Sequence, residues 1–176
     1  EYVYLSEDLI NLSGRKFHAK RNHISKFKNC YPDYRFEEIT NSNKEDAYKV
    51  MLDWCAENEI DIEHYEEKNA IREALDNMEE FKMHGGIVYV KDKAVAMTLG
   101  CEISPIAFDI CFEKALREYD GIYAVINNEF AKTLSSYKYI NREEDMGIEG
   151  LKKSKLSYNP IILIARYNAT LKNDGN

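Results

Sequence analysis

Residues 108–141 read FDICFEKALREYDGIYAVINNEFAKTLSSYKYIN, and the order of elements in this stretch decides the fold class. Residues 108–112 alternate as a β-strand does, residues 122–134 have the apolar spacing of a helix, and residues 137–141 predict a second strand. A helix that connects two strands of one sheet makes a right-handed crossover and leaves those strands parallel. We therefore expect the strands at 108–113 and 137–141 to be parallel neighbours that separate at one end.

The segments on either side extend this unit into a larger mixed sheet. Hairpin and strand patterns precede it, and a short basic helix with a last strand follows it. In chain order, the further predicted elements are a helix at 15–29, a strand at 34–40, two helices that end near residue 83, a hairpin at 86–91 and 94–102, a helix at 148–157 and a strand at 161–167.

This order of elements resembles the GNAT acyltransferase fold over residues 34–167. The predicted class is α/β (α+β), with a mixed, mostly antiparallel sheet flanked by helices and preceded by a basic linker helix. We expect residues 1–33 to form an N-terminal segment that contains this linker helix. Residues 34–170 are expected to form the GNAT-like domain, and residues 171–176 a frayed tail.

The charge of the chain is unevenly distributed. The 176 residues fall within the usual size of one domain, and their net charge of −7 speaks against general nucleic-acid or anionic-membrane binding. Six basic residues and no acid nevertheless lie between Leu9 and Pro32. Such a cationic face can bind a polyanion, either tRNA or phospholipid headgroups. A solvated surface, or a helix that pairs with an acidic partner domain, are the alternatives.

Cysteine spacing and hydropathy bear on metal binding, disulfide formation, membrane insertion and cellular location. The four cysteines lie far apart without a C-x-x-C pair, which indicates neither a zinc site nor a disulfide framework. No apolar run approaches the ~18 residues of a membrane span, and the sequence shows no signal-peptide pattern. We therefore expect no metal, no transmembrane segment and a cytoplasmic location.

The loop at residues 117–124 bears on the choice of acyl donor. A loop that enters a helix presents backbone N–H groups to an anion, and GNAT enzymes carry an Arg/Gln-x-x-Gly-x-Gly/Ala loop here that holds the pyrophosphate of coenzyme A. Between Arg117 and Ala124 this sequence has one residue too many and a single glycine, Gly121. Tyr119 and Tyr123 would also crowd a pyrophosphate. The loop therefore disfavours coenzyme A as the donor.

Four segments together resemble one family. They are residues 14–27, 112–115, 126–130 and 141–158, of which the last is the most specific. The family is the group of uncharacterised bacterial proteins similar to the C-terminal domain of phosphatidylglycerol lysyltransferase, which are relatives of the Fem-type aminoacyltransferases. The resemblance covers nearly the whole chain. It implies that the chain is the C-terminal half of a protein with a preceding N-terminal GNAT-like domain.

The resemblance implies transfer of an aminoacyl group from aminoacyl-tRNA to an amine or hydroxyl acceptor, without a metal or a further cofactor. A lipid headgroup, a peptide or a small molecule would be the acceptor. One alternative is a non-catalytic GNAT-like module that binds tRNA or a protein partner. Acetyl-CoA-dependent N-acetylation is the less favoured alternative.

Three residues are the candidates for catalysis. Glu113, at the end of a central strand, is the candidate general base, and Lys114 can stabilise developing negative charge. Tyr158 lies where many GNAT enzymes place the acid that protonates the leaving group. The alternatives are a structural Glu113–Lys114 pair and a buried packing role for Tyr158. The residues expected to bind tRNA or substrate are Arg15, Lys16, Lys20, Arg21, Asn22, Asn127, Asn128, Asn141, Arg142, Lys152, Lys153 and Lys155.

Overall fold

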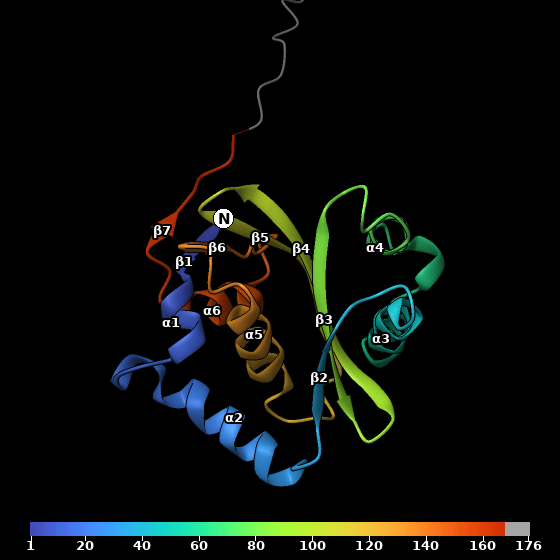
Figure 1. The fold of residues 1–176 in the computed structure, drawn as a ribbon, viewed down its shortest axis with the longest axis horizontal. Coiled ribbons are helices and arrows are strands. Elements are labelled where there is room, and N and C mark those ends of the chain that lie inside the picture. Colours follow the sequence, from blue (N-terminus) through green and yellow to red (C-terminus); the bar gives the residue numbers. More distant parts are fainter. Residues whose placement is uncertain (168–176) are drawn as a thin grey trace, which may run out of the picture.

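The computed structural model describes residues 1–167, and the structural statements below refer to this part of the chain. Seven strands form one sheet, with helices on both of its faces (Figure 1). The strands are β1 (Tyr2–Leu5), β2 (Arg35–Glu38), β3 (Met83–Val90), β4 (Lys93–Ser104), β5 (Ala107–Ala115), β6 (Tyr139–Asn141) and β7 (Ile162–Leu163). The helices are α1 (Ser6–Asn11), α2 (His18–Cys30), α3 (Lys44–Glu57), α4 (Glu67–Asp76), α5 (Ile122–Thr133) and α6 (Glu149–Leu156), with 3-10 turns at Arg15–Phe17 and Ile62–His64.

The parallel pair predicted from residues 108–141 is present. The strand order is β2-β3-β4-β5-β6-β1-β7, and β5 pairs with β6 in parallel while the other neighbours are antiparallel. The pairing runs from Ala107 opposite Tyr139 to Asp109 opposite Asn141. There β6 ends, whereas β5 continues to Ala115. The two strands therefore part at one end, as predicted.

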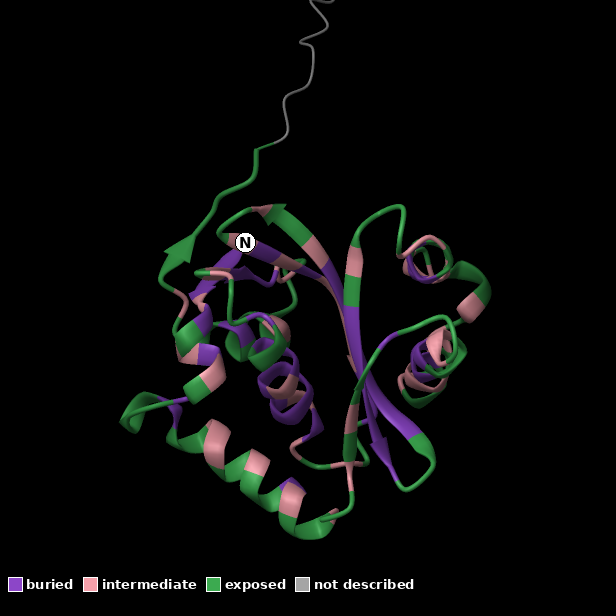
Figure 2. Cartoon of the chain, viewed as in Figure 1, coloured by how far each residue is buried: buried purple, intermediate pink, exposed green. Residues whose placement is uncertain are grey.

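Two helical layers cover different parts of the sheet. Helices α3 and α4 pack on one face, where Met51, Leu75, Met97 and Leu99 are fully buried. Helix α5 lies on the other face between the sheet and α2, and it is buried around most of its surface (Figures 1 and 2). Burial of these apolar surfaces is the main force that holds both layers to the sheet.

The N-terminal segment contains two elements that the sequence does not predict. Strand β1 pairs with β6 on one side and with β7 on the other, and α1 follows it directly. Because both faces of β1 are covered, its first residues are all buried and show no alternation of polar and apolar side chains. Residues 1–33 thus contribute a strand to the sheet, and the domain boundary at residue 33 stays a prediction. The tail at residues 171–176 lies outside the described residues.

Several predicted elements have different bounds. The helix at 15–29 is a 3-10 turn followed by α2, with Phe17 and Phe27 fully buried on its apolar stripe. The strand at 161–167 is reduced to the two residues of β7, because it forms the sheet edge and its side chains are exposed. Within residues 1–167, none of the helices is both long and apolar enough to cross a membrane.

Candidate functional site

A buried ion pair spans the point where β5 and β6 part. Glu113 lies on β5 beyond the last residue paired with β6, and Arg142 follows β6 directly. Arg142 Nη2 donates a hydrogen bond to Glu113 Oε1 at 2.8 Å. The two side chains are 9% and 12% exposed, respectively. Removing one partner of such a pair would leave an uncompensated charge in the protein interior.

Polar atoms without partners gather around this pair. Glu113 Oε2 and Arg142 Nη1 are both buried and make no hydrogen bond among the described residues. The same holds for Thr98 Oγ1, which lies opposite Glu113 in the β4–β5 register, and for both amide atoms of Asn127 on α5. An unsatisfied buried donor or acceptor costs about 1–3 kcal/mol. Their concentration near the strand separation marks this region as the candidate binding site for a polar ligand.

Two tyrosines enclose the Arg142 guanidinium. Its central carbon lies 4.9 Å from the ring centroid of Tyr158 and 5.9 Å from that of Tyr4. The two rings meet edge to face, and the Tyr4 hydroxyl donates to the Lys155 carbonyl at 2.9 Å. Burial raises the pKa of Tyr158 to about 12, although the nearby Arg142 charge opposes the shift. The Tyr158 hydroxyl is therefore protonated at neutral pH.

Helix α2 brings Lys20 to the same place. Lys20 Nζ lies 3.8 Å from the ring centroid of Tyr158, a distance typical of a cation–π interaction. Burial, together with the positive charge of Arg142, lowers the pKa of Lys20 to about 8, against the opposing charge of Glu113. Lys20, predicted to bind tRNA, thus lies beside two of the predicted site residues.

Lys114 lies on the opposite face of the sheet from Glu113. Its Nζ donates to Glu67 Oε2 at 2.6 Å and lies 4.5 Å from the ring centroid of Trp54 on α3. Successive side chains of a strand point to opposite faces, so Glu113 and Lys114 do not share one site. The alternative of a structural Glu113–Lys114 pair also fails, because each side chain pairs with a different residue.

The loop before α5 binds an anion from its own chain. The carboxylate of Glu57 accepts hydrogen bonds from the backbone N–H of Arg117 at 2.9 Å and of Glu118 at 3.1 Å. Helix α2 also packs against the start of α5: a Cβ atom at Gly121 would lie 2.4 Å from the His23 carbonyl oxygen. The backbone of this loop is therefore already occupied and covered.

The remaining predicted binding residues divide into two groups. In the first group, the side chains are held by hydrogen bonds within the protein. Arg21 donates to the carbonyls of Leu12 and Gly14, and Asn128 donates to those of Leu9 and Ile10. Lys155 donates to the carbonyls of Arg142 and Glu144, and Asn141 donates to the Glu1 carboxylate. The exposed ones are Arg15, Lys16, Asn22, Lys152 and Lys153. The structure thus brings together Lys20, Glu113, Arg142 and Tyr158, with Asn127 on the adjacent helix.

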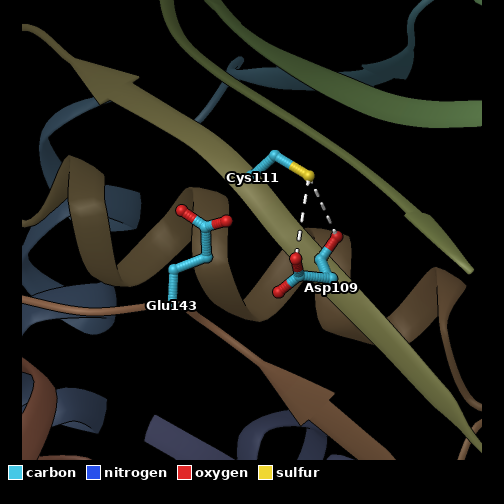
Figure 3. A group of neighbouring side chains, drawn as sticks. All are labelled: Asp109, Cys111 and Glu143. Carbon is cyan, nitrogen blue, oxygen red and sulfur yellow. Dashed lines mark hydrogen bonds between the residues drawn. The ribbon is translucent and has the colours of Figure 1, made fainter. Parts of the chain in front are cut away.

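A second cluster of side chains lies on β5 and in the segment that follows β6 (Figure 3). The cluster consists of Asp109, Cys111 and Glu143. Within residues 1–167 it is the sole group of three His, Cys, Asp or Glu side chains whose potential metal-ligand atoms all lie within 4.8 Å of one another. Cys111 Sγ is 3.9 Å from Asp109 Oδ2, and burial raises the pKa of all three groups. The sequence does not indicate this cluster, because Glu143 joins it only through the β5–β6 pairing. Carboxylate and thiol groups in this arrangement could hold a divalent cation. The sequence analysis, in contrast, predicts no metal site.

Comparison with known proteins decides the family. The family described as "Phosphatidylglycerol lysyltransferase, C-terminal" matches residues 1–170. The chain belongs to this family. A conserved protein of unknown function from Bacteroides thetaiotaomicron is 45% identical, with a TM-score of 0.86 over 92% of this chain and 56% of that one. L-PGS from Bacillus licheniformis is 13% identical, with a TM-score of 0.62 over 92% of this chain and 56% of that one. The chain spans little more than half the length of these two relatives.

The fold recurs in acetyltransferases. A ribosomal-protein-alanine N-acetyltransferase from Brucella melitensis biovar Abortus is 9% identical, with a TM-score of 0.55 over 81% of this chain and 99% of that one. At this identity the likeness concerns the fold alone. The α+β GNAT-like fold and the family predicted from the sequence are both confirmed.

Proposed function

We propose that the chain is the GNAT-like catalytic part of an aminoacyltransferase. It moves an aminoacyl group from aminoacyl-tRNA to an amine or hydroxyl of a lipid headgroup, a peptide or a small molecule. The observation that carries this proposal is the buried Arg142–Glu113 pair. Where β5 and β6 part, Arg142 Nη1 and Glu113 Oε2 have no hydrogen-bond partner in the described part of the chain. A preceding GNAT-like domain and a cytoplasmic location, where the tRNA donor occurs, belong to the same proposal.

The unused atoms suit the charges of acyl transfer. Aminoacyl-tRNA is an activated ester, so alignment of donor and acceptor supplies much of the acceleration, up to ~7–11 kcal/mol in well-aligned systems. Arg142 Nη1 donates a hydrogen bond to the carbonyl oxygen of the ester, which becomes negative during attack. Glu113 Oε2 accepts a hydrogen bond from the attacking amine or hydroxyl and orients it. Tyr158, protonated at neutral pH, is the acid near the leaving oxygen.

The occupied loop before α5 supports tRNA rather than coenzyme A as the carrier of the acyl group. Glu57 uses the backbone N–H groups of Arg117 and Glu118 that a pyrophosphate would need. A bound pyrophosphate would also meet the negative charge of this carboxylate. Acetyl-CoA-dependent N-acetylation is therefore the least supported of the three functions.

Exposed basic residues next to the site support a tRNA surface. Lys16 lies in the turn before α2, and Lys152 and Lys153 lie on α6, which precedes Tyr158. Both elements contact the site through Lys20 and Tyr158. Phosphates bound along them would bring the aminoacyl end of a tRNA toward Arg142. Arg15 and Asn22 extend the same surface.

Burial of the site favours the second candidate function, a binding module without catalysis. Tyr158 is 3% exposed, and the Arg142 and Glu113 side chains are about a tenth exposed. A transferase must admit its substrates to these groups by a shift of the surrounding segments, whereas a binding module needs only the outer basic surface.

A radiolabelled transfer assay separates these functions. The purified protein is supplied in parallel with a mixture of aminoacyl-tRNAs and with acetyl-CoA, together with amine and hydroxyl acceptors. Transfer from aminoacyl-tRNA that falls at least tenfold in Glu113→Gln supports the proposal. Transfer from acetyl-CoA alone would reverse the choice of donor. Binding of tRNA without transfer would leave the binding module as the function.

A further inference from the structure

We propose that Lys20 is the proton acceptor of the transfer step, a role that rests on the proposed aminoacyl transfer. Lys20 takes the proton from the attacking amine or hydroxyl, while Glu113 orients the acceptor. The sequence alone places Lys20 among phosphate-binding residues of a basic helix. The geometry assigns it to the site instead.

Among residues 1–167, Lys20 differs from its neighbours in having no carboxylate partner. Lys16 pairs with Asp8 at 2.8 Å, Lys26 with Asp120 at 2.5 Å and Lys28 with Glu129 at 3.2 Å. Within the described residues, Lys20 makes neither a hydrogen bond nor an ion pair, and its Nζ lies over the Tyr158 ring. An amine without a carboxylate partner can lose its proton more readily than the paired lysines.

The charges around Lys20 favour its neutral form. Arg142, at the end of β6, is the nearby cation, and Glu113, on β5, is the opposing anion. Tyr4 of β1 and Tyr158 after α6 have raised pKa values and stay neutral, and Lys155 of α6 is bound to backbone carbonyls. On its own segment, Lys16 is paired with Asp8 and Arg21 is bound to backbone carbonyls. The resulting pKa of about 8 gives Lys20 a substantial neutral fraction near physiological pH.

A base is most effective when its pKa lies near the working pH. A carboxylate is a weaker base than a neutral amine, and Glu113 already accepts a hydrogen bond from Arg142. Lys20 therefore suits proton removal, and Glu113 suits orientation.

The chemical step balances with these groups alone. The lone pair of the acceptor nitrogen or oxygen forms a bond to the ester carbonyl carbon, and the proton of that atom passes to Lys20 Nζ. The bond between the carbonyl carbon and the ribose oxygen then breaks. The ribose oxygen receives one proton, from Tyr158 or from Lys20, and proton exchange restores both groups. The products are the aminoacylated acceptor and free tRNA.

Two substitutions distinguish a proton acceptor from a phosphate-binding residue. Lys20→Arg keeps the positive charge but stays protonated at every pH used, whereas Lys20→Met keeps the apolar stem without a charge. Lys49→Met, at an exposed position of α3, is the matched control. If Lys20 accepts the proton, we expect kcat to fall at least a hundredfold in both Lys20 variants, with KM for aminoacyl-tRNA changed less than threefold. We also expect kcat of the parent to rise with pH up to about 8 and then level.

A second measurement is independent of activity. NMR titration of the lysine Cε–H signals should show a signal with a pKa near 8 that is missing from Lys20→Met. If Lys20→Arg retains kcat and changes only KM, Lys20 binds phosphate and the proposal is overturned. A pKa above 10 for Lys20 overturns it as well. Absence of any transfer by the parent overturns both the proposed function and this role, whereas transfer with an unaffected Lys20→Arg overturns this role alone.

Discussion

Glu57 and Arg117 are joined by a hydrogen bond in which the backbone N–H of Arg117 donates to the Glu57 carboxylate at 2.9 Å. The bond links the last residue of α3 to the loop before α5, and the next backbone N–H, that of Glu118, donates to the same carboxylate. An internal carboxylate thus uses the donors that a coenzyme A pyrophosphate would need.

Coenzyme A should consequently bind weakly. We expect a Kd no tighter than about 1 mM, equivalent to ~4 kcal/mol, because a ligand must displace Glu57 and meets α2 at Gly121. Isothermal titration calorimetry with acetyl-CoA checks this expectation. Micromolar binding would show that Glu57 moves away readily, and acetyl-CoA would then become the first candidate donor.

The Arg142–Glu113 pair should show strong thermodynamic coupling. Arg142→Met should lower the free energy of unfolding by about 3–5 kcal/mol, because Glu113 then keeps a buried charge without a partner. Glu113→Leu combined with Arg142→Met should restore much of this loss, since both charges are gone. Urea denaturation of the two single variants and the double variant measures the coupling. Additive losses would contradict a direct pair.

Substitution of Lys114 should leave the rate of transfer nearly unchanged, in contrast to substitution of Glu113. Lys114→Met should lower the free energy of unfolding by about 1–3 kcal/mol through loss of the bond to Glu67, and should change kcat for transfer less than threefold. The physical reason is that Lys114 lies on the α3–α4 face of the sheet. A large loss of kcat with unchanged stability would return Lys114 to the catalytic residues.

The exposed basic surface should govern the salt dependence of tRNA binding. Changing Lys16, Lys152 and Lys153 to Ala should weaken binding, and the slope of log K against log salt should flatten by roughly 0.7–0.9 for each phosphate that the variant no longer binds. Filter binding over a salt series measures the slope. Phe17→Ala serves as the contrast, because it should cost about 3–5 kcal/mol of stability by opening a buried cavity. A triple variant that binds tRNA like the parent would exclude this surface.

Lys20 should also make stability depend on pH. Its pKa is lowered from an ordinary 10.5 to about 8 in the folded chain, so the unfolded chain binds more protons between these two values. The free energy of unfolding of the parent should therefore rise with pH across this window, relative to Lys20→Met, by roughly 1–3 kcal/mol. Below pH 8 the parent carries the full cost of the half-buried Lys20 ammonium. If the free energies of unfolding of the parent and Lys20→Met change equally between pH 7 and 10, the lowered pKa is contradicted.

Local patterns in the sequence determined most of the architecture. The β-α-β order of residues 108–141 led to the parallel β5–β6 pair, and the apolar stripe of Phe17 and Phe27 led to α2. Strand alternation also holds enough information to place Glu113 and Lys114 on opposite faces, because neighbours on a strand cannot point the same way. Strand β1 was not predicted, because its first three residues are all buried and show no alternation of polar and apolar side chains.

The site itself was decided only by the tertiary structure. Glu113 and Arg142 lie 29 residues apart and meet because β5 and β6 pair over three residues and then part. Lys20 reaches Tyr158 because α2 packs across α5, and Glu57 reaches the loop before α5 because α3 ends beside it. Periodicity and spacing report which face of its own element a residue occupies. The packing of elements that are distant in the sequence then decides which faces come into contact and which charged groups are desolvated.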